Sequence, residues 1–177
     1  MKVIMVIIST INGKITKDSD PYIYTWTSKE DQEYFYSLLE KNRVMIMGST
    51  TYKAVKKNIR LNKNRLRIVL TKNPDMYQKD EVKGQLEFSK ELPAELIQRL
   101  NREGYKQALL LGGGKINTSF LKMNLVDRLY LTLEPTIFGL GKPFLAEDQL
   151  EISLKLISKK KLNNKGTLLL KYQILKK

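Results

Sequence analysis

The chain has 177 residues, 42% of them hydrophobic, and a formal net charge of +14. This length suits one domain with a sizeable core, so we expect a single domain over residues 1–177. Because the sequence contains neither Cys nor His, it excludes disulfides, thiol nucleophiles, Cys/His metal sites and Ser-His-Asp chemistry, and we expect no metal. Proton transfer must therefore use carboxylates, Tyr, Lys or water.

The positive charge allows three interpretations: a solvated basic surface, a site for an anionic small molecule, or a nucleic-acid interface. The Lys and Arg residues are scattered, and the densest group, residues 159–161, lies in a tail rich in predicted hairpin strands. No aromatic-basic motif of single-strand readers interleaves them. We therefore expect a small-molecule substrate and no nucleic acid, and keep a basic nucleic-acid-binding module as the alternative from another class.

Residues 1–8 form an apolar run that is too short to span a membrane, which needs about 20 residues, and no small-residue cleavage site follows it. It predicts a buried first strand in a cytoplasmic protein without membrane contact. Further short strands are predicted at 44–47, 66–70, 86–88 and 107–111, and helices at 28–41, 51–57, 93–102 and 115–122. Longer alternating strands are predicted at 126–133, 151–158 and 167–175, the last two joined by a turn around 163–166.

This order of elements predicts an α/β fold. Helices would cover both faces of a mixed, mostly parallel sheet in three α/β/α layers, and an antiparallel hairpin would close the C-terminal end. In such sheets ligands bind beyond the carboxyl ends of the strands, where the loops gather. The residues that follow each strand are therefore the first candidates for a site.

The stretch "LLLGGGKINTSFL", residues 109–121, places Gly112, Gly113 and Gly114 between an apolar strand and a helix. A helix N-terminus presents unpaired N–H groups and the positive end of the dipole, and glycine lets the backbone come close to a ligand. A pyrophosphate fits such a place. The motif is neither G-x-G-x-x-G nor a Walker loop, so a tight turn without a ligand is the alternative.

Three other predicted strands also end in small or hydroxylated residues, in the stretches "STINGKI", "MIMGSTTY" and "IVLTKNP". This composition is expected where a phosphorylated ligand lies across strand ends, although each stretch is also ordinary turn or capping chemistry. Together they favour a ligand. The residues concerned are Asn12, Gly13, Gly48, Ser49, Thr50, Thr51, Thr71 and Lys72.

Five motifs in order, "TINGKI", "MGSTTY", "VLTKNP", "LGGGKINTSFL" and "RLYLTLEPTIFGLGKPFL", resemble the dihydrofolate reductase superfamily over nearly the whole chain. That superfamily includes the reductase domain of the bifunctional riboflavin deaminase-reductase. The resemblance implies a dihydrofolate reductase-like fold, NADPH as cofactor, and a pyrophosphate site at the glycine stretch. The cofactor-binding residues it implies are Gly13, Gly48, Ser49, Thr50, Thr51, Thr71, Lys72, Gly112, Gly113, Gly114, Lys115 and Ile116.

The choice between NADPH and NADH stays open. Dihydrofolate reductases often place an Arg after the Gly of the "MG" motif, where it pairs with the 2′-phosphate of NADPH, and Ser49 stands there in this chain. Lys53 or Lys72 could supply the missing positive charge.

On the substrate side, the spacing of Trp26 and Asp31 resembles the tryptophan and helix-borne acid of dihydrofolate reductases, and Thr132 matches the threonine that accompanies this acid. The resemblance makes Asp31 the catalytic acid and adds Asn12 and Leu111 to the substrate-binding residues. An Asp beside Trp26 in an apolar wall would have its pKa raised by desolvation. The alternative is that Asp31 serves the helix N-terminus together with Ser28.

Two substrates compete. Residues 134–145 and the "TINGKI" opening favour the riboflavin-pathway reductase, which reduces a ribosylaminopyrimidine phosphate. Against it, Leu111 replaces the usual Glu before the glycines, Asn12 replaces the usual Asp, and the Asp-Asp-Pro segment is missing.

Three features favour dihydrofolate as the substrate: Leu111 before the glycines, Thr132, and the spacing of Trp26 and Asp31. Against it, the Leu-Pro-Trp run is missing and no clear arginine clamp for a glutamate tail is found, although Arg60, Arg65 and Arg67 lie nearby. We expect a 5-amino-6-(5-phosphoribosylamino)uracil reductase-type activity first and dihydrofolate reduction second, with a third small substrate still open. Because riboflavin-type reductases are commonly dimers, the resemblance also implies a homodimer.

Overall fold

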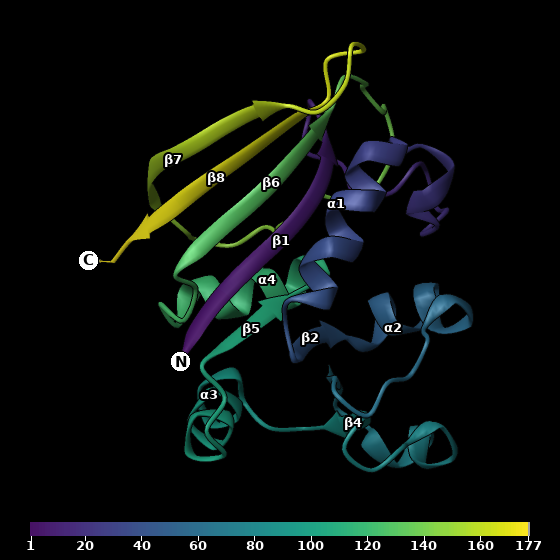
Figure 1. Ribbon diagram of the computed structural model, residues 1–177, viewed down its shortest axis with the longest axis vertical. Helices are drawn as coiled ribbons and strands as arrows, with labels where there is room; N and C mark the ends of the chain where they lie inside the picture. Colours follow the sequence, from purple (N-terminus) through teal and green to yellow (C-terminus); the bar gives the residue numbers. More distant parts are fainter. Residues whose placement is uncertain (177) are drawn as a thin grey trace.

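The computed structural model describes residues 1–176, and its eight strands form one sheet in the order β4-β3-β2-β5-β1-β6-β8-β7 (Figure 1). The strands are β1 Lys2–Thr10, β2 Val44–Gly48, β3 Leu66–Leu70, β4 Leu86–Ser89, β5 Gln107–Leu110, β6 Arg128–Glu134, β7 Ser153–Lys161 and β8 Leu168–Leu175. The six strands from β4 to β6 run parallel, whereas β8 and β7 add an antiparallel hairpin. The predicted mixed, mostly parallel sheet is confirmed.

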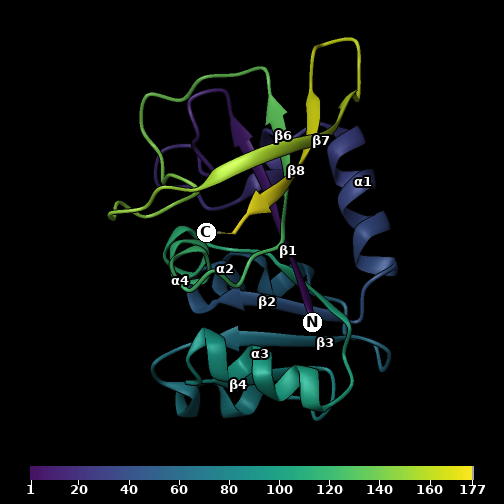
Figure 2. The ribbon, with the colours of Figure 1, turned by 90° about the vertical axis from the view of Figure 1, so that its left-hand side faces the viewer.

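Helices cover both faces of the sheet, as predicted. The helices are α1 Lys29–Glu40, α2 Ser49–Val55, α3 Pro93–Arg102 and α4 Gly114–Lys122, with 3-10 turns η1 Ile23–Thr25, η2 Lys56–Asn58 and η3 Pro74–Asp80. Figure 2 shows α1 on one side of the sheet and α4 on the other. The helix predicted at 51–57 begins two residues earlier, directly after its N-cap Gly48, and tightens into a 3-10 turn after Val55.

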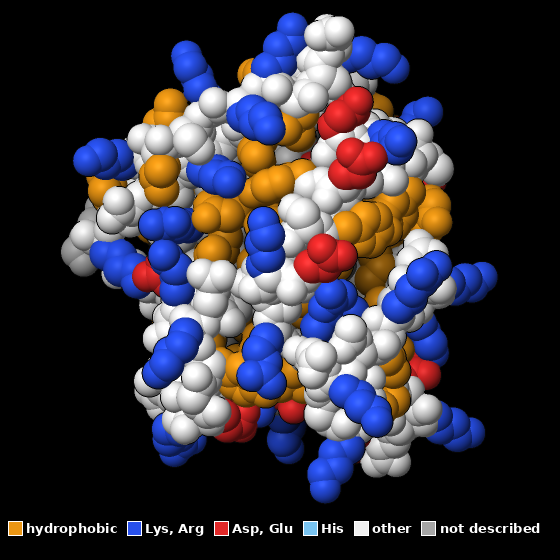
Figure 3. Space-filling model, viewed as in Figure 1, with side chains coloured by type: hydrophobic (Ala, Val, Ile, Leu, Met, Phe, Trp, Pro, Cys, Tyr) orange, Lys and Arg blue, Asp and Glu red, His pale blue; other side chains and the backbone are white. Residues whose placement is uncertain are grey.

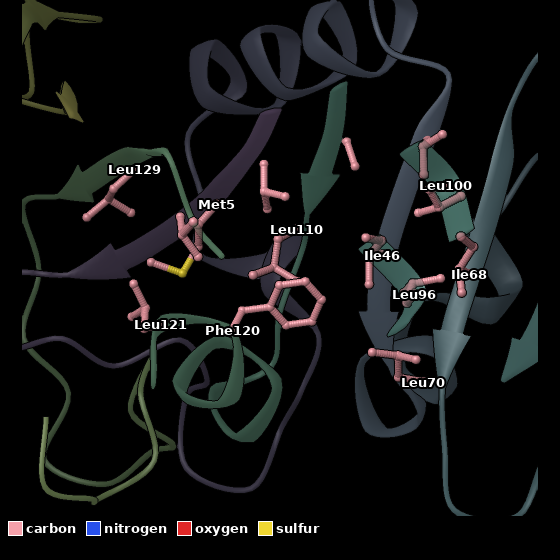
Figure 4. Close-up of a cluster of buried hydrophobic side chains, with 14 of the residues drawn as sticks. Met5, Ile46, Ile68, Leu70, Leu96, Leu100, Leu110, Phe120, Leu121 and Leu129 are labelled. Carbon is pink, nitrogen blue, oxygen red and sulfur yellow. The ribbon is translucent and has the colours of Figure 1, made fainter. Parts of the chain in front are cut away.

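The larger core lies between the sheet and the pair α3 and α4 (Figure 4). Side chains alternate along β1, so that Val3, Met5 and Ile7 all point into this layer. Removing each such side chain from water contributes about 1.5–3 kcal/mol. The helices contribute Leu96, Leu100, Phe120 and Leu121.

A second, partly aromatic cluster lies on the opposite face of the sheet, under α2 and η3. Tyr52 meets Phe88 edge-on at 5.0 Å between ring centroids, and Tyr77 stacks on Phe88 at 4.7 Å. The polar stretch before β4 therefore contains an ordered turn, because burying Tyr77 fixes η3 on the sheet. Met47, Val69 and Leu86 complete the cluster.

Two loops from distant parts of the sequence are joined at the carboxyl ends of β1 and β6. The Ile11 N–H donates to the Thr136 carbonyl at 3.0 Å, the Ile15 N–H to Lys142 at 2.8 Å, and the Phe144 N–H to Gly13 at 3.2 Å. These backbone bonds fix residues 11–18 against residues 136–144. The paired loops, called the loop pair below, form a wall beside the sheet edge where ligands are expected.

Gly141 is the tightest position of the loop pair. Its φ is +143°, and a Cβ there would lie 2.1 Å from the Thr16 carbonyl oxygen. We therefore expect Gly141→Ala to lower the free energy of unfolding by at least about 2 kcal/mol, measured by chemical denaturation. Gly139→Ala is the control, because a Cβ at Gly139 meets nothing within 4 Å. Equal stability of the two variants would contradict this account of the loop pair.

Candidate active site

The carboxyl ends of β5 and β2 bring two of the predicted cofactor loops into contact. The Gly48 N–H donates to the Gly112 carbonyl at 2.8 Å. A Cβ on Gly48 would lie 2.8 Å from Ile116 Cγ1, and a Cβ on Gly113 would lie 3.3 Å from the Thr51 hydroxyl oxygen. Residues 48–51 and 112–116, which the sequence predicted as two separate parts of a cofactor site, therefore form one continuous surface.

Packing within the protein accounts for two of the three consecutive glycines. Gly112 has a φ of +91°, which side chains rarely adopt, and a Cβ on Gly114 would lie 3.0 Å from the Pro143 carbonyl oxygen. Gly113 is different, because it is the N-cap of α4 and supplies no side-chain acceptor to the first turn. The N–H groups that open α4 thus have no capping side chain, which is the condition for binding an anion there.

The remaining predicted cofactor residues lie around these loops. Thr71 and Lys72 follow β3, the neighbour of β2, and the Thr71 N–H donates to the Ser89 carbonyl at 2.9 Å. A Cβ on Gly13, in the loop pair, would lie 3.5 Å from the Phe144 ring, in the segment that Gly114 also approaches. Exposed positions are Thr50, Lys72 and Lys115, and half-buried ones are Ser49, Thr51, Thr71 and Ile116.

The two lysines that could supply positive charge, Lys53 and Lys72, have different surroundings in the structure. Lys53 Nζ lies 5.9 Å from the centroid of the Tyr77 ring, a cation–π contact within the second cluster. Lys72 is exposed directly beyond the end of β3. Lys72 therefore has the freer ammonium group for a phosphate at the strand ends.

Asp31 lies in the first turn of α1, above β6, and its side chain is only 7% exposed. Burial raises the pKa of this carboxyl to about 6, a hydrogen bond with the Thr132 side chain opposes the rise, and the negative charge of Glu134 adds to it. The Asp31 N–H donates to Ser28 Oγ at 3.3 Å. Ser28 is thus the N-cap, and the Asp31 carboxyl group turns to Thr132.

The other predicted substrate residues have different surroundings. Trp26 meets Phe138 edge-on at 5.3 Å, and its buried Nε1 has no hydrogen-bond partner among the described residues 1–176. Asn12 Nδ2 donates to the Phe138 carbonyl at 2.7 Å, and the Phe138 N–H donates back to Asn12 Oδ1 at 3.3 Å. The Asn12 amide therefore holds the loop pair together. Leu111 packs against the second cluster, on the face of the sheet that α2 covers.

Three further groups lie near Asp31, and one of them, Glu134, had no role expected from the sequence. Glu134 is 4% exposed and lies two residues after Thr132, on the same face of β6. Tyr24 and Tyr34 have raised pKa values, chiefly because of burial, and the negative charge of Asp31 adds to both rises. The one sequence sign for Glu134 is its inward-facing position at the end of the predicted strand, two residues after Thr132.

The site combines a proton donor, polar atoms without partners and a helix start suited to an anion. A carboxyl group with a pKa of about 6 is partly protonated near neutral pH, so Asp31 can donate a proton to a substrate. The Tyr34 hydroxyl and Trp26 Nε1 are buried polar atoms without a partner in residues 1–176, so a bound molecule could use them. The uncapped start of α4 and the hydroxyl groups beside it fit a diphosphate.

Lys and Arg side chains are spread widely over the face shown in Figure 3. Within residues 1–176, no three Asp or Glu side chains lie together in a way that could hold a metal ion. No helix in that part of the chain has the length and apolar character needed to cross a membrane.

The sheet order, the helices on both faces and the strand-end loops define a dihydrofolate reductase-like α/β fold. Residues 1–168 match the model of the family described as the RibD C-terminal domain, and the chain belongs to this family.

Two Bacillus subtilis (strain 168) relatives are described as uncharacterized. YwjB is 26% identical over 161 residues, 88% of each chain. YyaP is 29% identical over 79 residues, which are 45% of this chain and 42% of YyaP. This second match thus spans less than half of either protein.

Similar solved structures support the fold. The diaminohydroxyphosphoribosylaminopyrimidine deaminase/5-amino-6-(5-phosphoribosylamino)uracil reductase of Thermotoga maritima has a TM-score of 0.75 and 16% identity, over 98% of this chain and 56% of that one. Dihydrofolate reductase from Enterococcus faecalis, solved with NADP(H), has a TM-score of 0.70 and 20% identity, over 99% of this chain and 97% of that one. The chain thus spans about half of the bifunctional protein and nearly all of the dihydrofolate reductase.

Proposed function

We propose that this protein is an NADPH-dependent reductase of a ribosylaminopyrimidine phosphate, of the 5-amino-6-(5-phosphoribosylamino)uracil reductase type. The observation that carries the proposal is the buried Asp31 carboxyl group at the start of α1, beside Thr132 of β6, together with the uncapped start of α4. Membership of the RibD C-terminal family supports a reductase of this superfamily. The substrate and NADPH are taken from the names of the Thermotoga and Enterococcus proteins.

NADPH, when bound, supplies the hydride that reduces C1′ of the ring-opened ribose. The residues of the chain perform the other tasks. The N–H groups that open α4, with Thr51 beside them, would hold the diphosphate. Asp31 holds a proton on its carboxyl group and gives it to the substrate atom that gains electrons. Trp26 and Phe138 pack together beside the site and exclude water from it.

Dihydrofolate is the second candidate substrate, because Asp31 beside Thr132 resembles the acid and the threonine of dihydrofolate reductases. In this chemistry Asp31 would promote protonation of the C=N nitrogen, and the carbon of the same bond would accept the hydride. Asp31 and Thr132 could serve either substrate in the same way, so Asp31 alone does not select one of them.

The decisive experiment measures NADPH oxidation in parallel with the ribosylaminopyrimidine phosphate and with dihydrofolate. A fluorescence titration with NADPH and NADH comes first, together with the ratio of absorbance at 260 and 280 nm of the purified protein. We expect saturable NADPH binding, no copurified nucleic acid, and turnover of the ribosylaminopyrimidine phosphate. Turnover of dihydrofolate alone would replace the first substrate by the second. Strongly salt-dependent nucleic-acid binding without NADPH binding would overturn the reductase.

We also propose a homodimer that forms through β7. All nine residues of this edge strand are exposed, and they include Leu154, Leu156 and Ile157. Exposed apolar side chains on an edge strand can pack against a second copy of the chain. We expect light scattering after size exclusion to give twice the chain mass, and Leu156→Lys to give the monomer mass. Leu92→Lys, at an exposed Leu before α3, is the control that should stay dimeric. A monomeric wild type would refute the dimer.

A further inference from the structure

Glu134, at the end of β6, is a buried carboxylate that the proposed reaction leaves without a task. Its Oε1 accepts the Ser28 N–H at 2.7 Å, and its Oε2 accepts the Thr167 hydroxyl at 2.6 Å. Burying a carboxylate is costly unless donors satisfy it. The two donors belong to different segments, so Glu134 joins the start of α1 to the start of β8.

Both donors lead toward the helix that carries Asp31. Ser28 is the N-cap of α1, and its Oγ accepts the N–H of Asp31 at 3.3 Å. On the other side, Asn163 Oδ1 accepts the Thr167 N–H at 3.2 Å, and Asn163 Nδ2 donates to Glu30 at 3.1 Å. A continuous chain of hydrogen bonds therefore runs from the β7–β8 turn through Glu134 to the first turn of α1.

We propose that Glu134 is a positioning residue for Asp31. Glu134 anchors the first turn of α1, so that the Asp31 carboxyl group stays against Thr132. The negative charge of Glu134 also favours the protonated form of Asp31. The inference rests on the proposed function, because it takes Asp31 as the proton donor. Glu134 need not contact the substrate. It acts through the place and the protonation state of Asp31.

The groups around Asp31 agree with this assignment. Asp31 interacts with Thr132 and Glu134 of β6. It also interacts electrostatically with Tyr34 of α1 and Tyr24 of η1. The charges of Lys29 and Lys165 act on Glu30, at the outer side of the helix start. Glu134 is the residue among these whose negative charge adds to the raised pKa of Asp31.

The test is an NMR titration of the Asp31 side-chain carbon in the full-length protein, with amide exchange at Ser28 and Asp31. For Glu134→Gln we expect the Asp31 midpoint to move to lower pH, exchange at both amides to accelerate, and kcat to fall by about 10- to 100-fold. Glu87→Gln is the matched control. Glu87 is bonded to Arg99 at the other end of the sheet, and its loss should leave the Asp31 midpoint unchanged.

Thr167→Val separates the two parts of the inference and replaces Glu134→Gln if that variant does not fold. It removes one donor and keeps the charge of Glu134, so exchange at Ser28 and Asp31 should accelerate without a downward move of the Asp31 midpoint. An unchanged midpoint in Glu134→Gln, or unchanged exchange in Thr167→Val, overturns the inference. If the wild type binds no NADPH, the proposed function fails, whereas the titration and exchange results still decide whether Glu134 positions Asp31.

Discussion

Asp31→Asn should lower kcat by about 10²- to 10⁴-fold, the usual contribution of a positioned proton donor. The Asn amide keeps the size and polarity of the side chain and can still meet Thr132, but it holds no acidic proton. The predicted cofactor loops lie at the ends of β5, β2 and β3, whereas Asp31 lies above β6. We therefore expect the Kd for NADPH to be unchanged. Full turnover of the Asn variant would remove Asp31 from the mechanism.

The pH dependence of the wild type follows from the same group. Because burial raises the pKa of Asp31 to about 6, the protonated donor disappears as pH rises through that value. The kcat/KM of the wild type should fall across this range, while the residual activity of Asp31→Asn should lack this step. A profile with no change near pH 6 in the wild type would argue against Asp31 as the donor.

The same substitution should stabilise the fold at high pH. The folded-state pKa of Asp31, about 6, lies above its ordinary value of 3.8, so the folded protein binds a proton that the unfolded chain releases between these values. The contribution of Asp31 to the free energy of unfolding is therefore highest below pH 4 and falls as the pH rises through 6. Asp31→Asn removes the buried charge, and at pH 8 we expect it to unfold with about 1–3 kcal/mol more free energy than the wild type.

Gly113→Asp should raise the Kd for NADPH by at least about 100-fold, equivalent to about 2.8 kcal/mol. Gly113 is the N-cap of α4 and lacks a side chain to occupy the first-turn N–H groups. An Asp carboxylate there would bind those N–H groups itself and would repel a diphosphate. A Cβ at this position meets Thr51 Oγ1 at 3.3 Å, a contact that a small shift of the Thr51 side chain relieves. A fluorescence titration measures the effect.

Gly113→Asn separates charge from size. Asn is also a good N-cap but brings no negative charge, so its effect on the Kd should be clearly smaller than that of Asp. Thermal unfolding of both variants should stay close to that of the wild type, because an N-cap side chain favours the helix. Wild-type affinity in Gly113→Asp would show that the start of α4 does not hold the diphosphate.

Much of the fold follows from local sequence patterns. The short apolar runs that became β2, β3 and β5 are bounded by polar or glycine residues, and Pro93 and Gly104 delimit α3 as expected. Parallel strands end at one edge of a sheet, which is why residues 48–51 and 112–116 could be predicted to lie together. The sequence could not tell that Gly112 and Gly114 are needed for packing, because their neighbours are set by tertiary contacts.

The parts that sequence reasoning did not find depend on contacts between distant residues. Asn12 bonds the backbone of Phe138, 126 residues away, so its role in the loop pair has no local pattern. The Thr167 hydroxyl reaches Glu134 from the segment just before β8. Such bonds form only after the sheet has brought the segments together, whereas strand and helix patterns are visible in any short window of sequence.

The place of β1 in the sheet has a consequence for synthesis of the protein on the ribosome. Residues 2–5 pair with 107–110, and residues 4–10 pair with 128–134. β1 leaves the ribosome before both of its neighbours, so it has no partner until residue 110 has left the exit tunnel and lacks its second partner until residue 134 has left, several seconds later at about 5–20 residues per second. Until then at least one of its edges is open to strands of other nascent chains. Stalled products shorter than this length should need a chaperone to stay out of aggregates.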